Sequence, residues 1–415
     1  MELQCPPFLR LLRFFAAKTN VIVRTPFEIA IMKRIAFAFG SLGLMLLAAA
    51  GASGQTKEFA DAKLAWTLPW DADWVTSVSF IGNDRVAAGT KLGEILVWKL
   101  PEPGAKAPMP AQRLAGHTNE VTRLVTAPDQ KALISASNDH SIQVWDMTRD
   151  QGEAGVVVLN SRARENALSK KKKEPPAVEA KVVVQKSTRQ LVGHKDWVLG
   201  LSLSRDGKTL VSGDDKGVVI VWDFAAGKEV RRWKLSGWAW GLGVSPDGKS
   251  ALISERIPLI FDSGARTALK IWNVETGEVR ADLGKVIKER MAQAAYSPDG
   301  KWLAVVRGGE ANGLSGKVTL LDPATGKKLR ETSPGHLDGA TDLAFHPDGK
   351  HIFSSGRDTL VKIWRLEDGK HVRDLGQGRG GQFKDWICAI AISPNGQYVA
   401  AADMAGQVQV YSLTK

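Results

Sequence analysis

Residues 335–365 read GHLDGATDLAFHPDGKHIFSSGRDTLVKIWR, and this stretch decides the fold. An apolar alternating segment leads to a His-Pro-Asp-Gly turn at 346–349, and a second short strand and a polar loop then precede the closing strand, which ends at Trp364. Pro presets such a turn, and Gly accepts the positive φ angle that closes a short hairpin. Alternation with a period of two is the pattern of β-strands. The stretch therefore predicts consecutive antiparallel strands joined by tight turns.

The same order of elements recurs along the chain. Seven apolar runs end in Trp or in a residue that takes its place, and these are Trp98, Trp145, Trp222, Trp272, Leu321, Trp364 and Tyr411. The intervals between them, by subtraction, are 47, 77, 50, 49, 43 and 47 residues. A period of roughly 40–50 residues is typical of a β-propeller with four strands in each blade. The sequence thus predicts an all-β, seven-bladed propeller, with six or eight blades as alternatives because degenerate blades are easily miscounted.

The way the ring closes is expected from its two ends. The last repeat stops at Tyr411, close to the end of the chain, and lacks a fourth strand, whereas residues 63–67 (Lys-Leu-Ala-Trp-Thr) form a strand candidate ahead of the first repeat. Pairing of these two segments would leave no open sheet edge. Residues 58–415 are then one domain, a monomeric ring with a core between each pair of blades.

The repeats resemble those of the WD-repeat family of β-propellers, over roughly residues 58–415. The resemblance lies in Gly-His pairs that precede Trp-Asp or Trp-Arg closers. In that family a hydrogen-bonded ladder of His, Ser, Asp and Trp ties outer strands to inner ones, each bond stabilising by about 1 kcal/mol. The implied ladders are His117, Ser135, Asp139 and Trp145; His336, Ser354, Asp358 and Trp364; and His194, Ser212, Asp215 and Trp222. In the third ladder Lys216 occupies the usual Asp position, and Asp215 precedes it.

The first 54 residues differ in composition from the rest. From Met32 the chain has a Lys-Arg pair, an apolar stretch from Ile35 to Ala50, and small residues up to Gly54, a pattern typical of a bacterial secretory signal. We interpret residues 32–54 as a signal peptide, and residues 1–31 as an upstream extension. The alternative is an uncleaved membrane anchor, because the apolar run is only slightly shorter than a bilayer span. The expected location is periplasmic or secreted, or membrane-anchored under the alternative.

The net charge of +12 is concentrated in two places. Residues 1–54 contribute +4 (six Lys/Arg, two Asp/Glu) and residues 149–190 contribute +5 (ten and five), which leaves about +3 on the propeller body. A basic face for nucleic acid is therefore not expected. An insertion at about 149–188 contains Lys170–Lys173, and we interpret it as a projecting loop or hairpin. Its charge run is either solvated or contacts an anionic membrane, a polysaccharide or an acidic protein.

A position just before each inner strand gives the sharper functional signal. Around the ring this position holds Trp74, Glu120, Trp197, Trp238, Arg290, Gly339 and Trp386. In the family the position resembles the rim of the central channel, on the face that binds peptides. Trp and Arg dominate interface hot spots, so the six residues other than Gly339 form a candidate rim for an extended peptide or a sugar. The alternative is that each Trp packs against the loop of its own blade.

Motifs for catalysis are missing from the sequence. His140, His346, His351 and His371 fall in turns or loops without the spacing of metal ligands, and there is no paired-cysteine, haem or nucleophile-elbow motif. We therefore expect no cofactor, no metal and no enzyme activity. The expected function is a non-catalytic scaffold that binds protein or peptide in the bacterial cell envelope. The alternatives are a quinoprotein-like or sugar-acting propeller enzyme, which would need acidic and basic side chains converging in the channel, and a membrane-tethered assembly factor.

Overall fold

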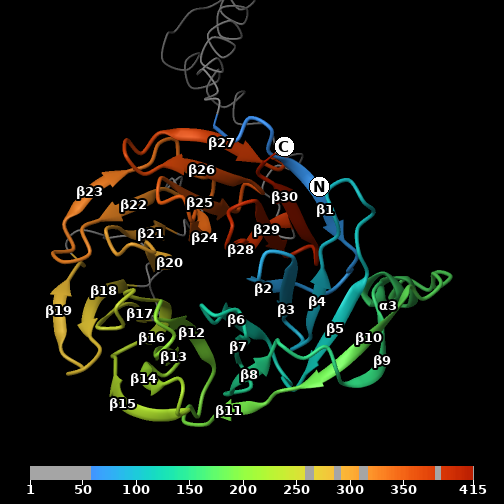
Figure 1. The fold of residues 1–415 in the computed structure, drawn as a ribbon, viewed down its shortest axis with the longest axis horizontal. Coiled ribbons are helices and arrows are strands. Elements are labelled where there is room, and N and C mark those ends of the chain that lie inside the picture. Colours follow the sequence, from blue (N-terminus) through green and yellow to red (C-terminus); the bar gives the residue numbers. More distant parts are fainter. Residues whose placement is uncertain (1–57, 258–265, 285–290, 308–315, 379–384, 415) are drawn as a thin grey trace, which may run out of the picture. The chain divides into compact units, whose positions relative to one another are not determined.

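Seven β-sheets stand side by side in a ring (Figure 1). The computed structural model describes residues 58–257, 266–284, 291–307, 316–378 and 385–414. By its internal contacts the chain divides into two units, Met1–Gln55 and Thr56–Lys415, and all described residues belong to the second. The leader predicted for residues 1–54 lies outside the described residues.

Each sheet is one blade, with its strands ordered from the channel outward. Blade 1 is β2 (Val75–Ile81), β3 (Arg85–Thr90), β4 (Ile95–Lys99), β5 (Pro110–Ala115), β10 (Glu179–Lys186) and β9 (Glu153–Val158). Blade 2 is β6 (Val121–Thr126), β7 (Ala132–Ser137), β8 (Ile142–Asp146) and β11 (Arg189–Leu191). Blade 3 is β12 (Val198–Leu203), β13 (Thr209–Asp214), β14 (Val218–Asp223) and β15 (Lys228–Lys234).

The remaining blades have the same four-stranded plan. Blade 4 is β16 (Trp238–Val244), β17 (Ser250–Ile257), β18 (Arg266–Asn273) and β19 (Val279–Asp282). Blade 5 is β20 (Met291–Tyr296), β21 (Leu303–Arg307), β22 (Val318–Leu321) and β23 (Lys328–Glu331). Blade 6 is β24 (Ala340–Phe345), β25 (His351–Gly356), β26 (Val361–Arg365) and β27 (His371–Leu375). Blade 7 is β28 (Ile387–Ile392), β29 (Tyr398–Asp403), β30 (Val408–Ser412) and β1 (Lys63–Leu68).

The ring closes as the sequence predicts. β1 pairs antiparallel with β30, with Lys63 opposite Ser412 and Leu68 opposite Val408. The innermost strands are neighbours all the way round, and β2 of blade 1 contacts β28 of blade 7 as well as β6 of blade 2. The prediction of seven antiparallel blades closed by an N-terminal strand is therefore confirmed.

The turn between the first two strands of a blade is built by its own side chains. In blade 4 the Ser245 hydroxyl donates to Asp247 Oδ1 at 2.6 Å and accepts a hydrogen bond from the Ser250 amide at 2.9 Å. Gly248 takes a φ of 72°, in the left-handed region that Gly adopts at no steric cost. These local bonds make the hairpin before any tertiary contact is needed, which explains why the Ser-Pro-Asp-Gly pattern marks blades so clearly.

The insertion differs from its prediction. Its strands β9 and β10 form an antiparallel hairpin, but β10 also pairs parallel with β5, so the hairpin extends blade 1 to six strands. Val157 and Val182 are buried in one cluster with Trp66 and Trp98. The insertion is therefore packed along its strands, because these valines supply an apolar face that a free loop would expose to water.

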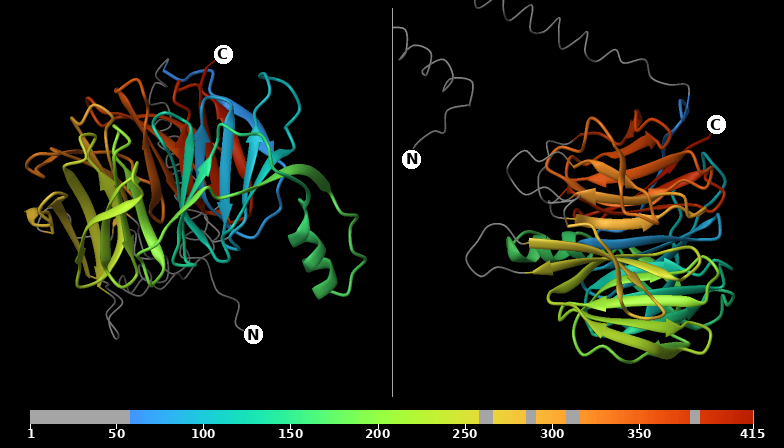
Figure 2. Two further views of the ribbon diagram at one scale, coloured as in Figure 1. Left: turned by 60° about the horizontal axis from the view of Figure 1, so that its bottom comes forward. Right: turned by 90° about the vertical axis from the view of Figure 1, so that its left-hand side faces the viewer.

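The tip of the insertion does extend from the ring, as Figure 2 shows. It holds α3 (Ser161–Ser169), the one helix among the described residues, which buries no side chain. Arg162 ties the start of α3 to the Ala405 carbonyl at 2.8 Å, and Lys170–Lys173 are exposed just after it. No helix in the described part of the chain has the length and hydropathy needed to cross a bilayer.

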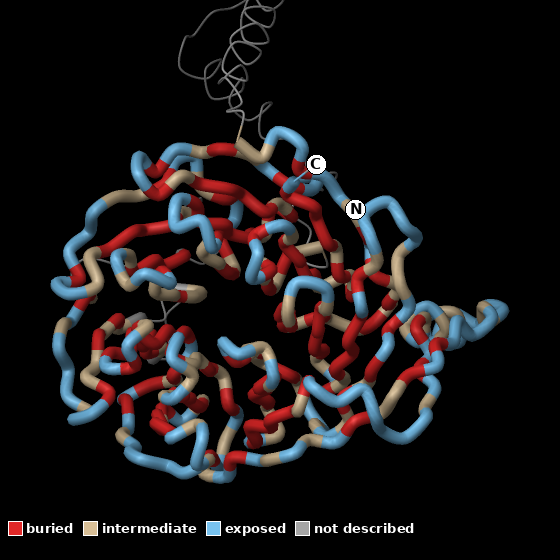
Figure 3. The backbone as a smooth tube through the Cα atoms, viewed as in Figure 1, coloured by how far each residue is buried: buried red, intermediate tan, exposed pale blue. Residues whose placement is uncertain are grey.

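Burial is greatest in the middle of each blade, and the outer strands face solvent (Figure 3). The four closing residues Trp98, Trp145, Trp222 and Trp364 are at most 2% exposed. Such a ring is rigid because each blade packs on two neighbours, so side chains on its ends are held in fixed positions.

A candidate binding site at the mouth of the central channel

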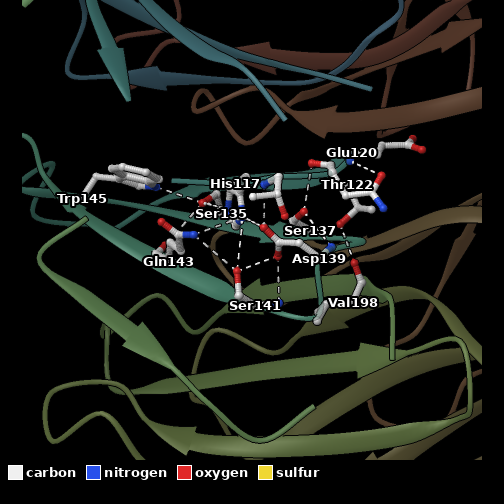
Figure 4. A network of polar contacts seen from close by, with 12 residues as sticks. His117, Glu120, Thr122, Ser135, Ser137, Asp139, Ser141, Gln143, Trp145 and Val198 are labelled. Carbon is white, nitrogen blue, oxygen red and sulfur yellow. Dashed lines mark hydrogen bonds and ion pairs between the residues drawn. The ribbon is translucent and has the colours of Figure 1, made fainter. Parts of the chain in front are cut away.

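Polar ladders fix three of the blades. In blade 2 the Trp145 indole donates to Ser135 Oγ at 2.9 Å, and Ser135 Oγ lies 2.6 Å from His117 Nε2. The other ring nitrogen, His117 Nδ1, lies 2.7 Å from Asp139 Oδ2 (Figure 4). Ser135 accepts from the indole, so its own proton goes to Nε2, which leaves Nδ1 as the donor to the carboxylate.

Blade 6 repeats this ladder with closely similar distances. Trp364 donates to Ser354 Oγ at 2.8 Å, His336 Nε2 lies 2.8 Å from that oxygen, and His336 Nδ1 lies 2.8 Å from Asp358 Oδ1. All four side chains have a structural partner, and His336 is 1% exposed. A buried network of this kind stabilises the fold and offers no group to a ligand.

The ladder of blade 3 contains a different aspartate from the one that the sequence predicts. Trp222 and His194 bond to Ser212 Oγ at 2.8 and 2.7 Å, but His194 Nδ1 lies 2.8 Å from Asp214 Oδ2. Asp215 is not the ladder residue. Successive side chains of a strand point to opposite faces, so the last residue of β13 reaches the histidine whereas the next residue points away from it.

Asp139 shows the electrostatic effect of a ladder. Burial by itself raises the pKa of this carboxyl group, but the hydrogen bonds from His117 and Ser141 outweigh burial and hold the pKa well below its usual range. The carboxylate therefore stays ionised at neutral pH, and its protonation would cost stability.

The central channel widens at one end into a cavity of about 560 Å³ that side chains of all seven blades line. Residues i and i+2 of a strand share a face, so each innermost strand sends two side chains toward the channel. The upper layer contains Trp74, Glu120, Trp197, Trp238 and Trp386. The second layer contains Thr76, Thr122, Leu199, Trp240, Ala292, Thr341 and Cys388.

Five of the six predicted rim residues thus line one cavity. Arg290 lies outside the described residues. Trp197 is the most open, at 48% exposed, and Trp240 is 37% exposed. Trp238 and Trp240 stack at 6.5 Å between ring centroids with an angle of 27° between their planes. Trp197 and Trp240 therefore present aromatic surface to the cavity.

A second ring of mouth residues is not among the residues predicted from the sequence. It contains the residues that follow the second strand of a blade, and their amides donate to the carbonyls of the upper layer. The bonds are Lys91 to Trp74, Asn138 to Glu120, Asp215 to Trp197, Arg357 to Gly339 and Met404 to Trp386, at 2.9 to 3.0 Å. Arg256 lies opposite Trp238 in the antiparallel pair of β16 and β17 and takes the corresponding position in blade 4. A spacing of 18 residues, as between Glu120 and Asn138, is the signal that could have found them.

Basic side chains of this second ring lie over the tryptophans. Lys91 Nζ lies 3.9 Å from the ring centroid of Trp74, and the guanidinium carbon of Arg357 lies 4.2 Å from that of Trp386. The guanidinium carbon of Arg256 lies 5.0 Å from the Trp238 ring and 5.5 Å from the Trp240 ring. Cation–π attraction holds such pairs together and keeps the positive charge at the mouth.

Charge at the mouth is only partly compensated. Burial lowers the pKa of Arg256 and raises the pKa of Glu120, which Lys91 opposes. Arg256 Nε and Asp215 Oδ1 are buried and have no hydrogen-bond partner among the described residues. An unpartnered buried donor costs roughly 1–3 kcal/mol, so an acceptor from a ligand would recover part of this energy.

Acidic and basic groups do converge in the channel, as an enzyme would require, but their bonds are structural. Asp342 Oδ2 accepts from the Ile390 amide at 3.0 Å, and Glu120 Oε2 accepts from Asn138 at 3.3 Å. The Cys388 thiol lies 3.8 Å from the Trp386 carbonyl, and burial raises its pKa to about 12. A nucleophile needs a base within hydrogen-bond reach, and these bonds join none of the three groups to another. The geometry favours binding over catalysis.

Comparison with known proteins agrees with this fold. Four segments match the family model of the WD domain, G-beta repeat, at residues 109–146, 185–223, 327–365 and 377–412. The chain is similar to the small ribosomal subunit protein RACK1 of Glycine max, with 27% identity over 290 residues, which cover 70% of this chain and 74% of that protein. It is also similar to the nuclear distribution protein nudF of Emericella nidulans, with 24% identity over 331 residues, which cover 71% of this chain and 68% of that protein.

A solved structure extends the comparison to the fold. The crystal structure of the WD40 beta propeller domain of Doa1 superposes with a TM-score of 0.63 and 17% identity, covering 85% of this chain and 97% of that one. At this identity the likeness shows the fold alone, and none of the three names is that of an enzyme. The chain is accordingly a seven-bladed β-propeller, four segments of which match the family model of the WD domain, G-beta repeat.

Proposed function

We propose that this propeller is a non-catalytic scaffold that binds an extended acidic segment of a partner protein at the mouth of its central channel. The observation that carries the proposal is the set of tryptophans that line the mouth with cations over their faces. Aromatic rings supply apolar contact area, and the nearby cations supply attraction for carboxylates. Few rotamers are lost on binding because the ring already holds these side chains.

The sign of the ligand charge follows from the cations that lie over the tryptophans. Lys91, Arg123, Arg256 and Arg357 are cations at the mouth, and Glu120, Asp215 and Asp338 are acids beside them. Asp342 lies deeper and accepts from two backbone amides. The cations over the tryptophan faces, together with the unpartnered Arg256 Nε, favour a peptide that carries Asp or Glu beside an aromatic or aliphatic residue.

The setting that we propose is the bacterial cell envelope, with the chain acting as a monomeric ring. Support comes from the signal-like residues 32–54 and from the exposed Lys170–Lys173, which would attract an anionic membrane surface. Sequencing of the mature N-terminus tests this part. Cleavage near residues 52–54 supports export, and an intact leader on a membrane-bound protein supports the tethered alternative.

A selection from a library of random linear peptides tests the binding site. The wild-type chain should enrich peptides that combine acidic and aromatic residues, and the W197A/W238A variant should enrich none of them. W302A is the matched control, because Trp302 also carries a cation over its ring, with Arg330 at 5.6 Å, but follows the turn at the opposite end of blade 5. Equal enrichment by all three proteins, or enrichment only of basic peptides, would contradict the proposal.

A further inference from the structure

The first turn of blade 6 differs chemically from the corresponding turns of four other blades. In those turns a serine hydroxyl donates to the Asp or Asn two residues later, from Ser204, Ser245, Ser297 and Ser393 at 2.5 to 2.7 Å. Blade 6 has His346 in place of the serine and a second histidine, His351, at the end of the turn. In blade 6 the Asp348 amide donates to His346 Nδ1 at 3.3 Å, so this turn is held by a different bond.

The two imidazoles converge on one carboxylate oxygen. His346 Nδ1 lies 3.1 Å from Asp348 Oδ2, and His351 Nδ1 lies 2.7 Å from the same oxygen. The ligand atoms of the three residues all lie within 4.8 Å of one another. The side chains of His346 and His351 are 10% and 7% exposed, and that of Asp348 is 31% exposed, which leaves one open side.

The outer nitrogens of both rings point to acceptors. His346 Nε2 lies 3.0 Å from the Gly396 carbonyl, which can only accept, so this nitrogen carries the proton. The Asp348 amide donates to His346 Nδ1 at 3.3 Å, so this nitrogen is the acceptor of the ring, and it lies 3.1 Å from the Asp348 carboxylate. A cation between Nδ1 and the carboxylate oxygen would be attracted to both.

His351 Nδ1 is hydrogen-bonded to Asp348 Oδ2 at 2.7 Å, and a metal ion would replace the proton of this bond. His351 Nε2 lies 3.6 Å from Glu58 Oε2 and has no hydrogen-bond partner within the described ranges. Histidines that bind a metal through one nitrogen commonly donate the other N–H to a carboxylate or a backbone carbonyl. Gly396 and Glu58 occupy these two outer positions.

An apolar wall surrounds the cluster. Phe59 packs edge-on against both imidazoles, at 5.4 Å from His346 and 4.9 Å from His351 between centroids, and Phe353 stacks on His346 at 5.7 Å. Such a wall limits water and orients the rings. Phe59 belongs to the segment just before β1, and Arg365 of blade 6 holds this segment in place by a hydrogen bond to Glu58 at 2.8 Å.

We propose that His346 Nδ1, His351 Nδ1 and Asp348 Oδ2 bind one divalent transition-metal ion of the zinc class. Nitrogen and oxygen ligands at about 2.0–2.2 Å in tetrahedral geometry lie roughly 3.3–3.5 Å apart. From 3.1 Å and 2.7 Å, the carboxylate oxygen therefore needs to move away by about 0.2–0.4 Å from His346 Nδ1 and by about 0.6–0.8 Å from His351 Nδ1. Water would complete the coordination from the open side. The ion would fix the start of the propeller chain to blade 6 through Phe59 and Glu58.

Metal titration of the purified, tag-free full-length chain tests the proposal, with Zn²⁺ followed by calorimetry and Co²⁺ by its visible absorption. We expect one ion per chain and a higher thermal midpoint with Zn²⁺. The variant H346S should lose at least about 100-fold in affinity and the thermal shift. It should still fold, because four other blades carry serine at this position.

H140N is the matched control, because His140 is an exposed histidine in the turn between β7 and β8 of blade 2, with a φ of 72°, which Asn tolerates. It should bind Zn²⁺ as the wild type does. Absence of saturable binding by the wild type, or the same affinity in wild type and H346S, would overturn the proposal.

Discussion

Arg357 of blade 6 lies over the indole ring of Trp386 of blade 7, with 4.2 Å between its guanidinium carbon and the ring centroid. The contact joins two neighbouring blades at the rim of the channel. The adjacent upper-layer position of blade 6 is Gly339, which has no side chain to cover the pair. Burial lowers the pKa of Arg357, yet a guanidinium group remains a cation at neutral pH. A positive charge on an aromatic face is thus presented to whatever enters the channel.

The closing tryptophans should be the main source of stability in their blades. W364A removes a side chain with no exposed surface and its bond to Ser354, and we expect a loss of about 3–5 kcal/mol in the free energy of unfolding. W364L should lose roughly half as much, because Leu321 fills the same position in blade 5. Chemical denaturation measures both values, and equal losses would show that the size of the side chain does not matter.

Substitution of the adjacent residues Asp214 and Asp215 tests which of them belongs to the ladder of blade 3. D214N should cost about 2–3 kcal/mol, because it removes a charged partner of the buried His194. D215N should change stability by less than about 0.5 kcal/mol, since this side chain lines the cavity and contacts Lys216 at 3.6 Å. Urea denaturation distinguishes them, and a larger loss for D215N would refute the assignment.

The ladder of blade 2 predicts a dependence of stability on pH. The pKa of Asp139 is lower in the folded chain than its ordinary value of 3.8, because its bonds to His117 and Ser141 outweigh the opposing effect of burial. Its contribution is therefore complete above about pH 4 and is lost as the pH falls toward the folded value. D139N should lose about 2 kcal/mol at pH 7 and should show a shallower loss of stability below pH 4 than the wild type. Identical acid profiles would contradict this account.

Cys388 should be unreactive despite its place in the channel. Burial, with smaller contributions from nearby carboxylates, raises its pKa to about 12 from 9.0. The thiolate is the reactive form, so alkylation by iodoacetamide at pH 8 should be about a thousandfold slower than for an ordinary thiol. Mass spectrometry of the peptide that contains Cys388 measures the rate, and the denatured chain is the control. A rate within tenfold of the control would exclude the raised pKa.

The sequence predicts the ring well because the evidence for each blade is local. Each signal lies within about one repeat: the Pro-Asp-Gly turn, the alternating strands and the spacing from Gly-His to Trp. The upper-layer residue of each blade is likewise found from its position within its own repeat. The strand that closes the ring was also predictable, since Lys63–Leu68 is alternating and Tyr411 ends the last repeat. Because the blades repeat, the strands and turns identified in one blade can be located at the same spacing in the other blades.

What the sequence did not predict depends on side-chain direction and on contacts between repeats. Asp214 and Asp215 are adjacent, and only the end of β13 decides which one faces His194. Docking of the insertion requires a parallel pairing of β10 with β5, which no pattern in the insertion encodes. The cations of the mouth come from a different strand than the tryptophans they cover. The histidines of blade 6 meet because the turn folds back between His346 and His351.

The central claim is that the channel mouth binds acidic peptide segments, and the affinity of one enriched peptide for matched variants tests it most directly. Fluorescence anisotropy should give a dissociation constant at least about tenfold higher for R357A and W238A than for the wild type. High salt should raise the dissociation constant of each protein further. R330A and W302A should bind as the wild type does, because that cation–π pair lies outside the channel. Equal affinity across all five proteins would contradict the account.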